Sequence, residues 1–327
     1  MPYRVVLIGA GIISRNHLNA IRQMKELSAA AVADIDEERG RTVSGEYGIT
    51  YYSDYKEMVR KEKPDIAIIA LPHFLHEECA IWCAAQGCHL LLEKPMALNV
   101  KQCDAILGAA RASGVKLMVG HTQHYWPANL LAKTLIESGE LGKLLAIQDT
   151  RHLYYFSEHR PAWFLDKAKA GGGILMNLGA HSIDKIQWLT GSRIKKVKAA
   201  LSYEGTRGNV EGSGCIFLET SSGVSAVIVQ SGYAGVARDE TELIFTQGMI
   251  RLVSAKGLWV SRDGRYEEVR PPCSTDPFVL QFEDLLQAIR QDAEPGSTGE
   301  YARSVIAALE AVYRSDETGV EQTLDAE

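Results

Sequence analysis

The chain has 327 residues, of which 46% are hydrophobic and 23% charged, as in ordinary globular proteins of about two domains. Its 35 basic and 41 acidic residues leave a net charge of −6, which argues against non-specific binding to nucleic acid or to an anionic membrane surface. The apolar run that starts at Ile66 is far shorter than the ~20 residues of a membrane helix, and the N-terminus resembles a strand rather than a signal peptide. We therefore expect a cytoplasmic protein.

Six cysteines are too few for a disulfide scaffold, and Cys79, Cys83 and Cys88 lack zinc-site spacing, so we expect no metal.

Strand and helix signals alternate through the first part of the chain, which predicts a doubly wound parallel sheet over residues 1–122. The expected strands are Tyr3–Ile8, Ala30–Ala33, Asp65–Leu71, His89–Leu92 and Lys116–Val119. The expected helices are Ile12–Met24, Glu37–Tyr47, a short helix capped by Ser53, Leu75–Gln86, and a helix capped by Asn99 that runs to Ser113.

The pattern changes after residue 122. A helix near Ala128–Ser138 precedes an alternating strand at Leu144–Tyr154, and a helix at Gly171–Thr190 follows. Successive strands without intervening helices then predict an open, mainly antiparallel sheet in a second domain, 123–327. The expected strands are Val197–Tyr203, Gly214–Glu219, Ser225–Gln230, Glu242–Thr246, Ile250–Val253 and Leu258–Ser261. Two final helices are expected at Pro277–Gln291 and Gly299–Thr318, either within the second domain or packed back on the first.

A glycine-rich turn follows the first strand and opens the first helix. Gly9 permits the tight turn, and Gly11 lets backbone N–H groups approach a pyrophosphate at the helix N-terminus. Asp34 ends the second strand, where a carboxylate accepts hydrogen bonds from ribose hydroxyls, so the context is that of a dinucleotide site. Ser14 stands at the third position of the motif in place of glycine or alanine.

The carboxylate at Asp34 also bears on the choice of cofactor. It would repel the 2′-phosphate of NADP, so NAD is favoured, while Arg39 and Arg41 downstream leave NADP as the less favoured alternative.

The sequence Glu93-Lys94-Pro95 lies at the carboxyl end of an expected strand, the edge that faces ligand in open α/β sheets. Proline keeps Lys94 out of the helical region. A solvated loop charge is the alternative interpretation of this lysine.

Three polar residues fall on one face of the expected Gly171–Thr190 helix: Asn177, His181 and Asp184, at spacings of four and three. Polar side chains among apolar neighbours need either hydrogen-bond partners or a functional role. The alternative to a functional role is that His181 is a core residue whose hydrogen bonds are all made within the protein. Asp184, one turn beyond His181, is placed to orient the imidazole.

Together, GAGIISRNH, EKP and GGGILMNLGAHSID resemble the glucose–fructose oxidoreductase / inositol dehydrogenase / rhizopine-catabolism (Gfo/Idh/MocA) superfamily. The resemblance implies a Rossmann domain, then an α+β domain with an open sheet, and NAD(P)-dependent chemistry on sugars and cyclitols. It implies that His181 is the base, that Lys94 stabilises the developing alkoxide, and that the helix face points at the nicotinamide cleft. Gly171–Gly173 would let the chain pass close to substrate.

The resemblance also implies residue sets for each ligand. The catalytic set is Lys94, His181 and Asn177. The cofactor set is Gly9, Gly11, Ile12, Ile13, Asp34, Leu71, Pro72, His76, Glu93, Lys94 and Gln123. The substrate set is Lys94, His124, Trp163, Asn177 and His181. A helix-start role for His76 and ordinary packing for Trp163 are the alternatives.

Two positions depart from the family pattern. Asn177 stands where many members have aspartate, and an amide cannot accept the proton that a carboxylate would relay. Members with asparagine act on modified or nucleotide-linked sugars, so the resemblance points away from simple inositol oxidation. His124 replaces an arginine.

The function expected is an NAD-dependent oxidoreductase that transfers hydride between nicotinamide and a secondary alcohol of a sugar, modified sugar or cyclitol. The alternatives are a glycoside hydrolase or lyase that uses NAD transiently and a non-catalytic dinucleotide-binding regulator. We expect a small-molecule substrate, no nucleic-acid or membrane partner, and a homodimer or homotetramer formed through the second domain's sheet.

Overall fold

The computed structural model describes residues 1–254, 256–272 and 274–324, so the last three residues of the expected second domain lie outside it. The chain folds into two compact units. Met1–Thr122 and Thr275–Arg303 form the first, and Gln123–Ser274 and Ser304–Glu327 form the second.

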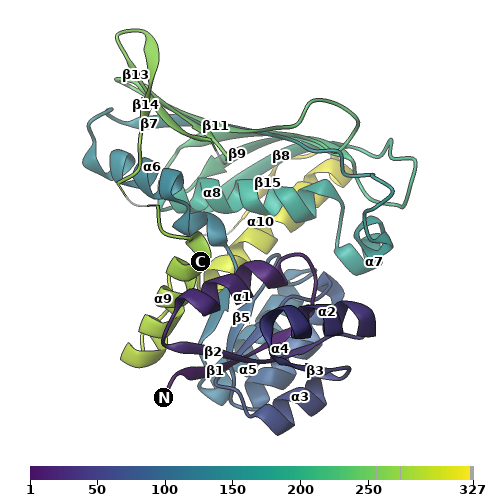
Figure 1. The fold of residues 1–327 in the computed structure, drawn as a ribbon. Helices are drawn as coiled ribbons and strands as arrows, with labels where there is room; N and C mark the ends of the chain where they lie inside the picture. The colour runs from purple at the N-terminus through teal and green to yellow at the C-terminus, as the bar shows by residue number, and fades with distance from the viewer. Residues whose placement is uncertain (255, 273, 325–327) are drawn as a thin grey trace. The chain divides into compact units, whose positions relative to one another are not determined.

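The first unit is built on a six-stranded sheet, ordered β3-β2-β1-β4-β5-β6, in which every neighbouring pair is parallel (Figure 1). Its strands are β1 (Tyr3–Ile8), β2 (Leu27–Ala33), β3 (Thr50–Tyr52), β4 (Ile66–Ile69), β5 (His89–Leu92) and β6 (Leu117–Val119). The central strand β4 is fully buried along its length, which explains its continuous apolar sequence. The predicted parallel sheet is confirmed.

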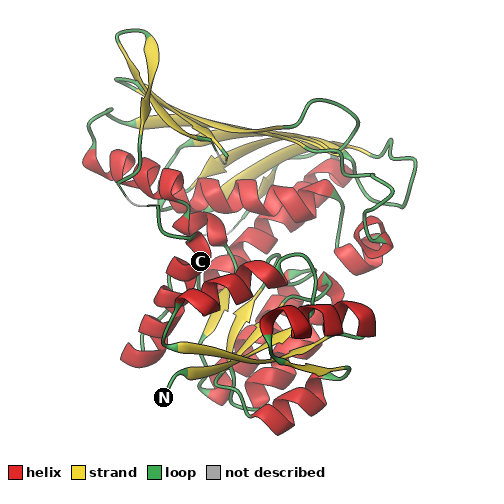
Figure 2. Ribbon diagram, viewed as in Figure 1, coloured by secondary structure: helices red, strands yellow, loops and turns green. Residues whose placement is uncertain are grey.

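Helices cover both faces of this sheet (Figure 2). They are α1 (Ser14–Gln23), α2 (Glu37–Tyr47), α3 (Tyr55–Glu62), α4 (His76–Ala85), α5 (Val100–Ser113) and α9 (Pro277–Gln291), with a 3₁₀ turn at His73–Leu75. Asn99 caps α5 as predicted, through a 2.9 Å bond from the Gln102 N–H. Ser53 was the wrong cap for α3: Asp54 accepts from the Lys56 N–H at 2.7 Å, since a carboxylate at this position reaches the free N–H groups of the first turn.

The second unit contains a nine-stranded sheet, ordered β14-β13-β12-β11-β7-β10-β9-β8-β15. Its strands are β7 (Leu144–His152), β8 (Ile194–Ser202), β9 (Ser213–Thr220), β10 (Ser225–Ser231), β11 (Arg238–Phe245), β12 (Met249–Val253), β13 (Gly257–Arg262), β14 (Arg265–Val269) and β15 (Gln322–Thr323). All neighbouring pairs are antiparallel except β7 and β10. The expected α/β architecture, with a mainly antiparallel second sheet, is confirmed.

Three helices lie against one face of this sheet (Figure 2): α6 (Pro127–Ser138), α8 (Ala180–Thr190) and α10 (Gly299–Thr318), of which α10 belongs to the second unit from Ser304 onward. The short helix α7 (Lys167–Ala170) follows a 3₁₀ turn at Ala162–Leu165, and a further 3₁₀ turn spans Thr122–Tyr125. Side chains on the other face include Phe217 and Val227, which are 42% and 40% exposed.

The expected single helix Gly171–Thr190 is wrong in its first half. Leu175–Gly179 form a π-helical turn, η4, and the α-helix α8 begins only at Ala180. Spacings of 3.6 residues per turn therefore do not extend from Asn177 to His181, and π turns of this kind often occur at functional sites.

Among the described residues, no helix combines the length and the apolar character needed to cross a membrane.

Candidate active site

The glycine turn of the first unit has the geometry of a phosphate-binding loop. Gly9 has φ 100°, and a Cβ there would lie 2.3 Å from the Ala70 carbonyl oxygen, so only glycine fits. A Cβ on Gly11 would meet nothing within 4 Å, which leaves the backbone at the start of α1 open to a ligand. The buried Ser14 hydroxyl donates to the Gly11 carbonyl at 2.5 Å. Serine at the third motif position thus closes the turn by a hydrogen bond.

Asp34, directly after β2, is surrounded by donors. Its Oδ2 accepts from the Ala10 N–H at 2.8 Å and Arg39 Nε at 3.0 Å, and its Oδ1 accepts from the Asp36 N–H at 2.8 Å and Arg39 Nη2 at 2.6 Å. Burial opposes ionisation, but the Arg39 guanidinium and the two N–H groups outweigh it and lower the pKa of Asp34. Ribose hydroxyls would therefore compete with Arg39 for this carboxylate.

Two isoleucines beside these residues are almost fully exposed. Ile12, after Gly11, is 94% exposed, and Ile35, after Asp34, is 93% exposed. Ile13, also in the expected cofactor set, is partly buried and precedes α1. Sequence reasoning missed Ile35, although an isoleucine directly after the acidic residue was a signal that could have found it.

The EKP segment is anchored through Glu93. This carboxylate is nearly buried, its Oε1 lies 2.8 Å from His17 Nε2 on α1, and its Oε2 accepts from the Lys94 N–H at 3.2 Å. Burial opposes its ionisation, but the hydrogen bond and charge of His17 outweigh burial, and the pKa of Glu93 is lowered. His17 packs edge-on against Phe278 of α9, with ring centroids 5.2 Å apart. Glu93 thus fixes the backbone from which the partly buried Lys94 projects.

His76 links two loops of the expected cofactor set. It is fully buried, with Nδ1 3.0 Å from the Pro95 carbonyl and Nε2 2.9 Å from the Leu71 carbonyl. Burial lowers its pKa, against the effect of both carbonyls. Its ring therefore ties the segment after β4, including Pro72, to the EKP segment. Direct contact between His76 and a cofactor stays a prediction.

In the second unit, Asn177 lies in the π turn η4 and His181 in the first turn of α8, and both are partly buried. Asn177 neighbours the buried Tyr155 phenol. Burial raises the pKa of Tyr155 to about 12, and interactions with Arg160 and Asn177 act in the opposite direction. Tyr155 is a neighbour of this candidate site that the sequence did not indicate.

The glycines that precede η4 serve internal packing. A Cβ on Gly172 would lie 1.9 Å from Tyr313 Oη, and one on Gly173 would lie 2.1 Å from the Glu211 carbonyl oxygen. The Glu211 carboxylate accepts from the N–H groups of Gly173 and Leu175 at 2.8 and 2.9 Å. Burial raises the pKa of Glu211 despite these donors. Gly172 and Gly173 are therefore required to leave room for Tyr313 and Glu211, and the expected close approach of substrate at Gly171–Gly173 stays a prediction.

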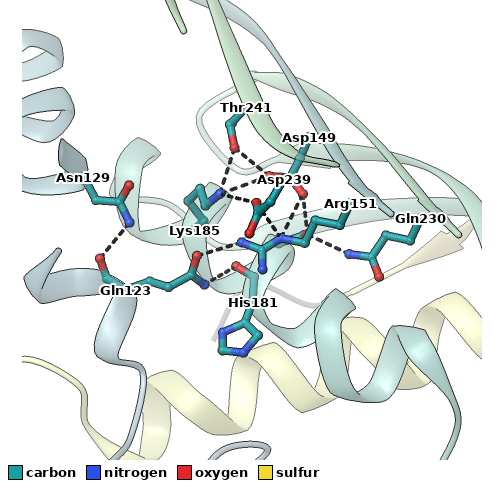
Figure 3. Close-up of polar contacts among 10 residues, drawn as sticks. Gln123, Asn129, Asp149, Arg151, His181, Lys185, Gln230, Asp239 and Thr241 are labelled. Carbon is teal, nitrogen blue, oxygen red and sulfur yellow. Dashed lines mark hydrogen bonds and ion pairs between the residues drawn. The ribbon is translucent and has the colours of Figure 1, made fainter. Parts of the chain in front are cut away.

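The backbone of His181 is tied to the sheet through Gln123 (Figure 3). Gln123 Nε2 donates to the His181 carbonyl at 2.9 Å, and Arg151 Nη2 on β7 donates to Gln123 Oε1 at 2.8 Å. Asn129 Nδ2 donates to the Gln123 carbonyl at 2.8 Å. The His181 imidazole points away from these contacts (Figure 3). The Gln123 amide, expected among the cofactor residues, is thus engaged at both ends within the second unit.

A buried ion-pair network continues beneath α8 (Figure 3). Lys185 Nζ lies 3.3 Å from Asp149 Oδ2 and 2.8 Å from Thr241 Oγ1, and Ser182 donates to Asp149 Oδ1. Asp149 is completely buried. Burial opposes its ionisation, but the charges of Lys185 and Arg151 and two hydroxyl donors outweigh burial and lower its pKa. Ser182 and Lys185 therefore fix α8 to Asp149 of β7, and Lys185 also fixes it to Thr241 of β11.

Asp184 has a partner that the sequence did not suggest. Its Oδ1 lies 2.6 Å from His124 Nε2, and the His124 ring stacks on Trp188 with centroids 5.0 Å apart. His124 is 3% exposed. The pair packs α8 against the chain before α6, while the expected roles of Asp184 at His181 and of His124 at substrate stay predictions.

Trp163 lies on a 3₁₀ turn, stacked on Phe164 at 3.7 Å between centroids. It lines a cavity of about 500 Å³ together with Ala162, Leu165, Asp166, Lys169, Arg207, Gly208 and Asn209. The expected substrate residue therefore borders a cavity within the second unit.

Comparison with known proteins agrees with this architecture. Residues 3–121 match the model of an oxidoreductase family with an NAD-binding Rossmann fold, and residues 129–251 match the GFO/IDH/MocA C-terminal domain. The chain belongs to the Gfo/Idh/MocA oxidoreductase family, and its first unit carries the family's NAD-binding domain.

Individual relatives are distant. The chain is 30% identical to 2,7-anhydro-N-acetylneuraminate hydratase of Mediterraneibacter gnavus over 64% of this chain and 55% of that protein, so the match spans little more than half of that relative's length. It is 24% identical to inositol 2-dehydrogenase 1 of Saccharopolyspora erythraea over 98% of this chain and 95% of that one. Among solved structures, aldose-aldose oxidoreductase from Caulobacter crescentus, complexed with glycerol, superimposes with a TM-score of 0.91 at 24% identity over 99% of this chain and all of that one.

Proposed function

We propose that this protein is an NAD-dependent oxidoreductase that transfers a hydride between nicotinamide and a secondary alcohol of a sugar, modified sugar or cyclitol. The observation that carries the proposal is the construction around His181. The His181 imidazole, in the first turn of α8, points away from a polar network (Figure 3). That network holds the backbone carbonyl of His181 through Gln123 and fixes α8 to the sheet through Lys185 and Asp149. Such support is typical of a side chain that must be held in one geometry for catalysis.

Each candidate residue has a distinct role in this reaction. His181 removes the hydroxyl proton as hydride leaves the carbon, because an imidazole is a base with a pKa close to neutral pH. The Lys94 ammonium stabilises the developing alkoxide, and the backbone contact to Glu93 holds it in place. Asn177 hydrogen-bonds a substrate hydroxyl, since an amide both donates and accepts but cannot relay a proton.

The first unit has the residues that NAD needs. The open backbone at Gly11 suits the pyrophosphate, the carboxylate of Asp34 suits the adenosine ribose, and the exposed Ile12 and Ile35 offer apolar contacts to the adenine ring. When bound, NAD would supply the hydride acceptor at its nicotinamide.

The decisive experiment is a screen of neutral sugars, acidic sugars, sugar phosphates and cyclitols for NADH formation. We expect at least one class to be oxidised. Protein that is purified with NAD and converts a sugar without net NADH would contradict net dehydrogenation and indicate transient oxidation instead.

We further propose that two copies of the chain pair through the sheet face that carries Phe217 and Val227. Both side chains are substantially exposed, they pair across β9 and β10, and the residues that alternate with them along these strands are buried. Apolar sheet surface of this kind favours association. Light scattering at micromolar concentration should give a dimer or tetramer, and Phe217→Glu should dissociate it. A monomeric wild-type protein would contradict the proposal.

A further inference from the structure

Two arginines in the second unit lack the carboxylate partner that buried cations usually have. Arg160 and Arg207 are both partly buried. The Arg160 Nε donates to the Tyr155 carbonyl, and its guanidinium lies over the Tyr155 ring at 3.8 Å. Within the described part of the chain, neither guanidinium has a carboxylate within the 4.0 Å of an ion pair, whereas eleven of the nineteen arginines have one. A cation withdrawn from water without an anion is unfavourable.

Backbone contacts place both arginines around one short segment. Arg207 Nη1 donates to the Ser157 carbonyl at 2.7 Å and the Phe156 carbonyl at 3.4 Å, beside the Tyr155 carbonyl that Arg160 uses. Three consecutive residues span at most ~7 Å between their outer Cα atoms, so the two positive charges act on the same small region. Tyr155 neighbours Asn177, which connects this region to the candidate catalytic residues.

The cavity that Arg207 lines has fixed walls. Gly208 has φ 77°, and a Cβ there would lie 2.1 Å from the Leu165 carbonyl oxygen. Asn209 Oδ1 accepts from the Lys167 N–H at 2.7 Å, and the Asn209 N–H donates to the Leu165 carbonyl at 3.0 Å. These contacts join the two chain segments that line the cavity, 162–169 and 207–209.

The charges in the cavity leave a positive excess. Lys169 Nζ lies 3.6 Å from Asp166 Oδ2, so these two side chains largely neutralise each other. Arg207 remains, with Trp163 on the same cavity offering a flat apolar surface. A ring with apolar C–H faces and one anionic substituent matches this combination of groups.

We infer that Arg207, assisted by the charge of Arg160, binds an anionic substituent of the substrate, so that the substrate is a sugar that carries a carboxylate or a phosphate. This inference rests on the proposed function, since it narrows the substrate class of the same reaction. Arg207 makes the direct contact because it lines the cavity, and Arg160 raises the positive potential beside it. A guanidinium can donate two parallel hydrogen bonds to either kind of anion.

The test measures binding to the NAD-saturated full chain by calorimetry at low salt, with D-glucuronate, D-glucose 6-phosphate and D-glucose as probes. We expect at least one anionic probe to bind about tenfold or more tightly than D-glucose, since one charge-assisted contact typically gives that factor. The anionic probe that binds more tightly shows whether the subsite prefers a carboxylate or a phosphate. Equal or weaker binding of both anions relative to D-glucose overturns the inference.

Substitutions then locate the contact. Arg207→Gln should remove the preference for the anion, and Arg160→Gln should reduce it by less. Arg262→Gln serves as the matched control, because it removes an exposed arginine from the β13–β14 hairpin. If Arg207→Gln weakens the binding of NAD or of D-glucose as much as it weakens the binding of the anionic sugar, the inference is wrong.

Binding and turnover separate the two proposals. Anion binding that depends on Arg207, without oxidation of any sugar, would leave the subsite intact and contradict the proposed dehydrogenase. Oxidation of neutral sugars with unchanged kinetics in Arg207→Gln would support the dehydrogenase and overturn the subsite.

Discussion

The glycine turn of the first unit and the η4–α8 segment of the second both present functional groups at a helix start, but they are built differently. In the turn, two defining contacts are local, since Ser14 bonds Gly11 and Asp34 bonds Arg39. The bond from the Ala10 N–H to Asp34 spans 24 residues, the fixed spacing between the first strand and the end of the second. The start of α8 depends on residues far away in the chain. Gln123, itself held by Arg151, donates to the His181 carbonyl. Glu211 accepts from the N–H groups of Gly173 and Leu175, before and at the start of η4.

This difference has a practical consequence. A site built from local contacts can be recognised in the sequence as a motif with fixed spacing. A site built from distant residues is seen in the sequence only as scattered polar positions. Substitution of the Asp34 side chain beside the turn should therefore alter ligand preference with little effect on folding, whereas substitutions beneath α8 should affect stability and catalysis together.

The largest effect is expected at the two proposed catalytic side chains. Lys94→Ala and His181→Ala should each lower kcat by about 10²–10⁴-fold, the usual loss for an oriented acid–base group, with NAD affinity within a few-fold of wild type. If both act in one step, the double variant should lose little more than the more damaging single variant. Steady-state kinetics with the substrate found in the screen measures this. Wild-type turnover in His181→Ala would remove the histidine from the mechanism, and full multiplication of the two losses would argue against a shared step.

The buried network beneath α8 should dominate stability. Asp149→Asn removes the nearer of the two carboxylates around the buried Lys185 and leaves only Asp239, at 4.0 Å. It should cost about 3–5 kcal/mol of unfolding free energy at pH 7, as for other buried pairs. Because the folded-state pKa of Asp149 is lowered, its contribution is complete above the unfolded pKa of ~3.9 and disappears as pH falls through the folded value. The gap between wild type and variant should therefore shrink in acid.

Denaturant unfolding from pH 7 to pH 3 measures that gap. Asp263→Asn, in the β13–β14 turn, is the exposed control and should stay within about 0.5 kcal/mol of wild type. A gap at pH 7 no larger than that of the control would show that the Asp149 pair contributes little to stability.

A smaller effect, confined to cofactor preference, is expected at the turn. NAD should bind more tightly than NADP, and Asp34→Ser should narrow or reverse the difference by removing the carboxylate that accepts ribose hydroxyls and repels a 2′-phosphate. The same change leaves Asp36 as the remaining acidic partner of Arg39, so that the guanidinium can also pair with that phosphate. Fluorescence titration with both cofactors measures the ratio. A preference of the unmodified protein for NADP would refute the assignment.

The smallest expected effect is a shift in pH dependence from Asn177→Asp. With asparagine, kcat/KM should rise through a single ionisation, that of His181, for which an unperturbed imidazole has a pKa of ~6.5. A carboxylate at 177 would favour the protonated imidazole and move this limb to higher pH. Because η4 is a π turn, the shift also reports whether residue 177 approaches His181 there. Superimposable profiles would show that the two side chains do not interact.

The sequence determined the features that arise from local contacts. Gly9, Gly11 and Asp34 were identifiable because a turn, a helix start and a strand end fall at fixed spacings around them. The parallel first sheet was predictable from its buried apolar strands, and the family was recognisable from three motifs. Each depends on which residues are near one another in the chain.

Only the tertiary structure decided the rest. It paired Asp184 with His124, placed Asn177 in a π turn that precedes α8, and filled the space beside the glycines with Glu211 and Tyr313. It also gathered Arg160 and Arg207 around one segment without an acidic partner. These contacts join residues up to about a hundred and forty positions apart, for example Gly172 and Tyr313. No spacing rule connects such pairs, because their proximity follows from how the strands of the sheet are ordered and which face the helices cover.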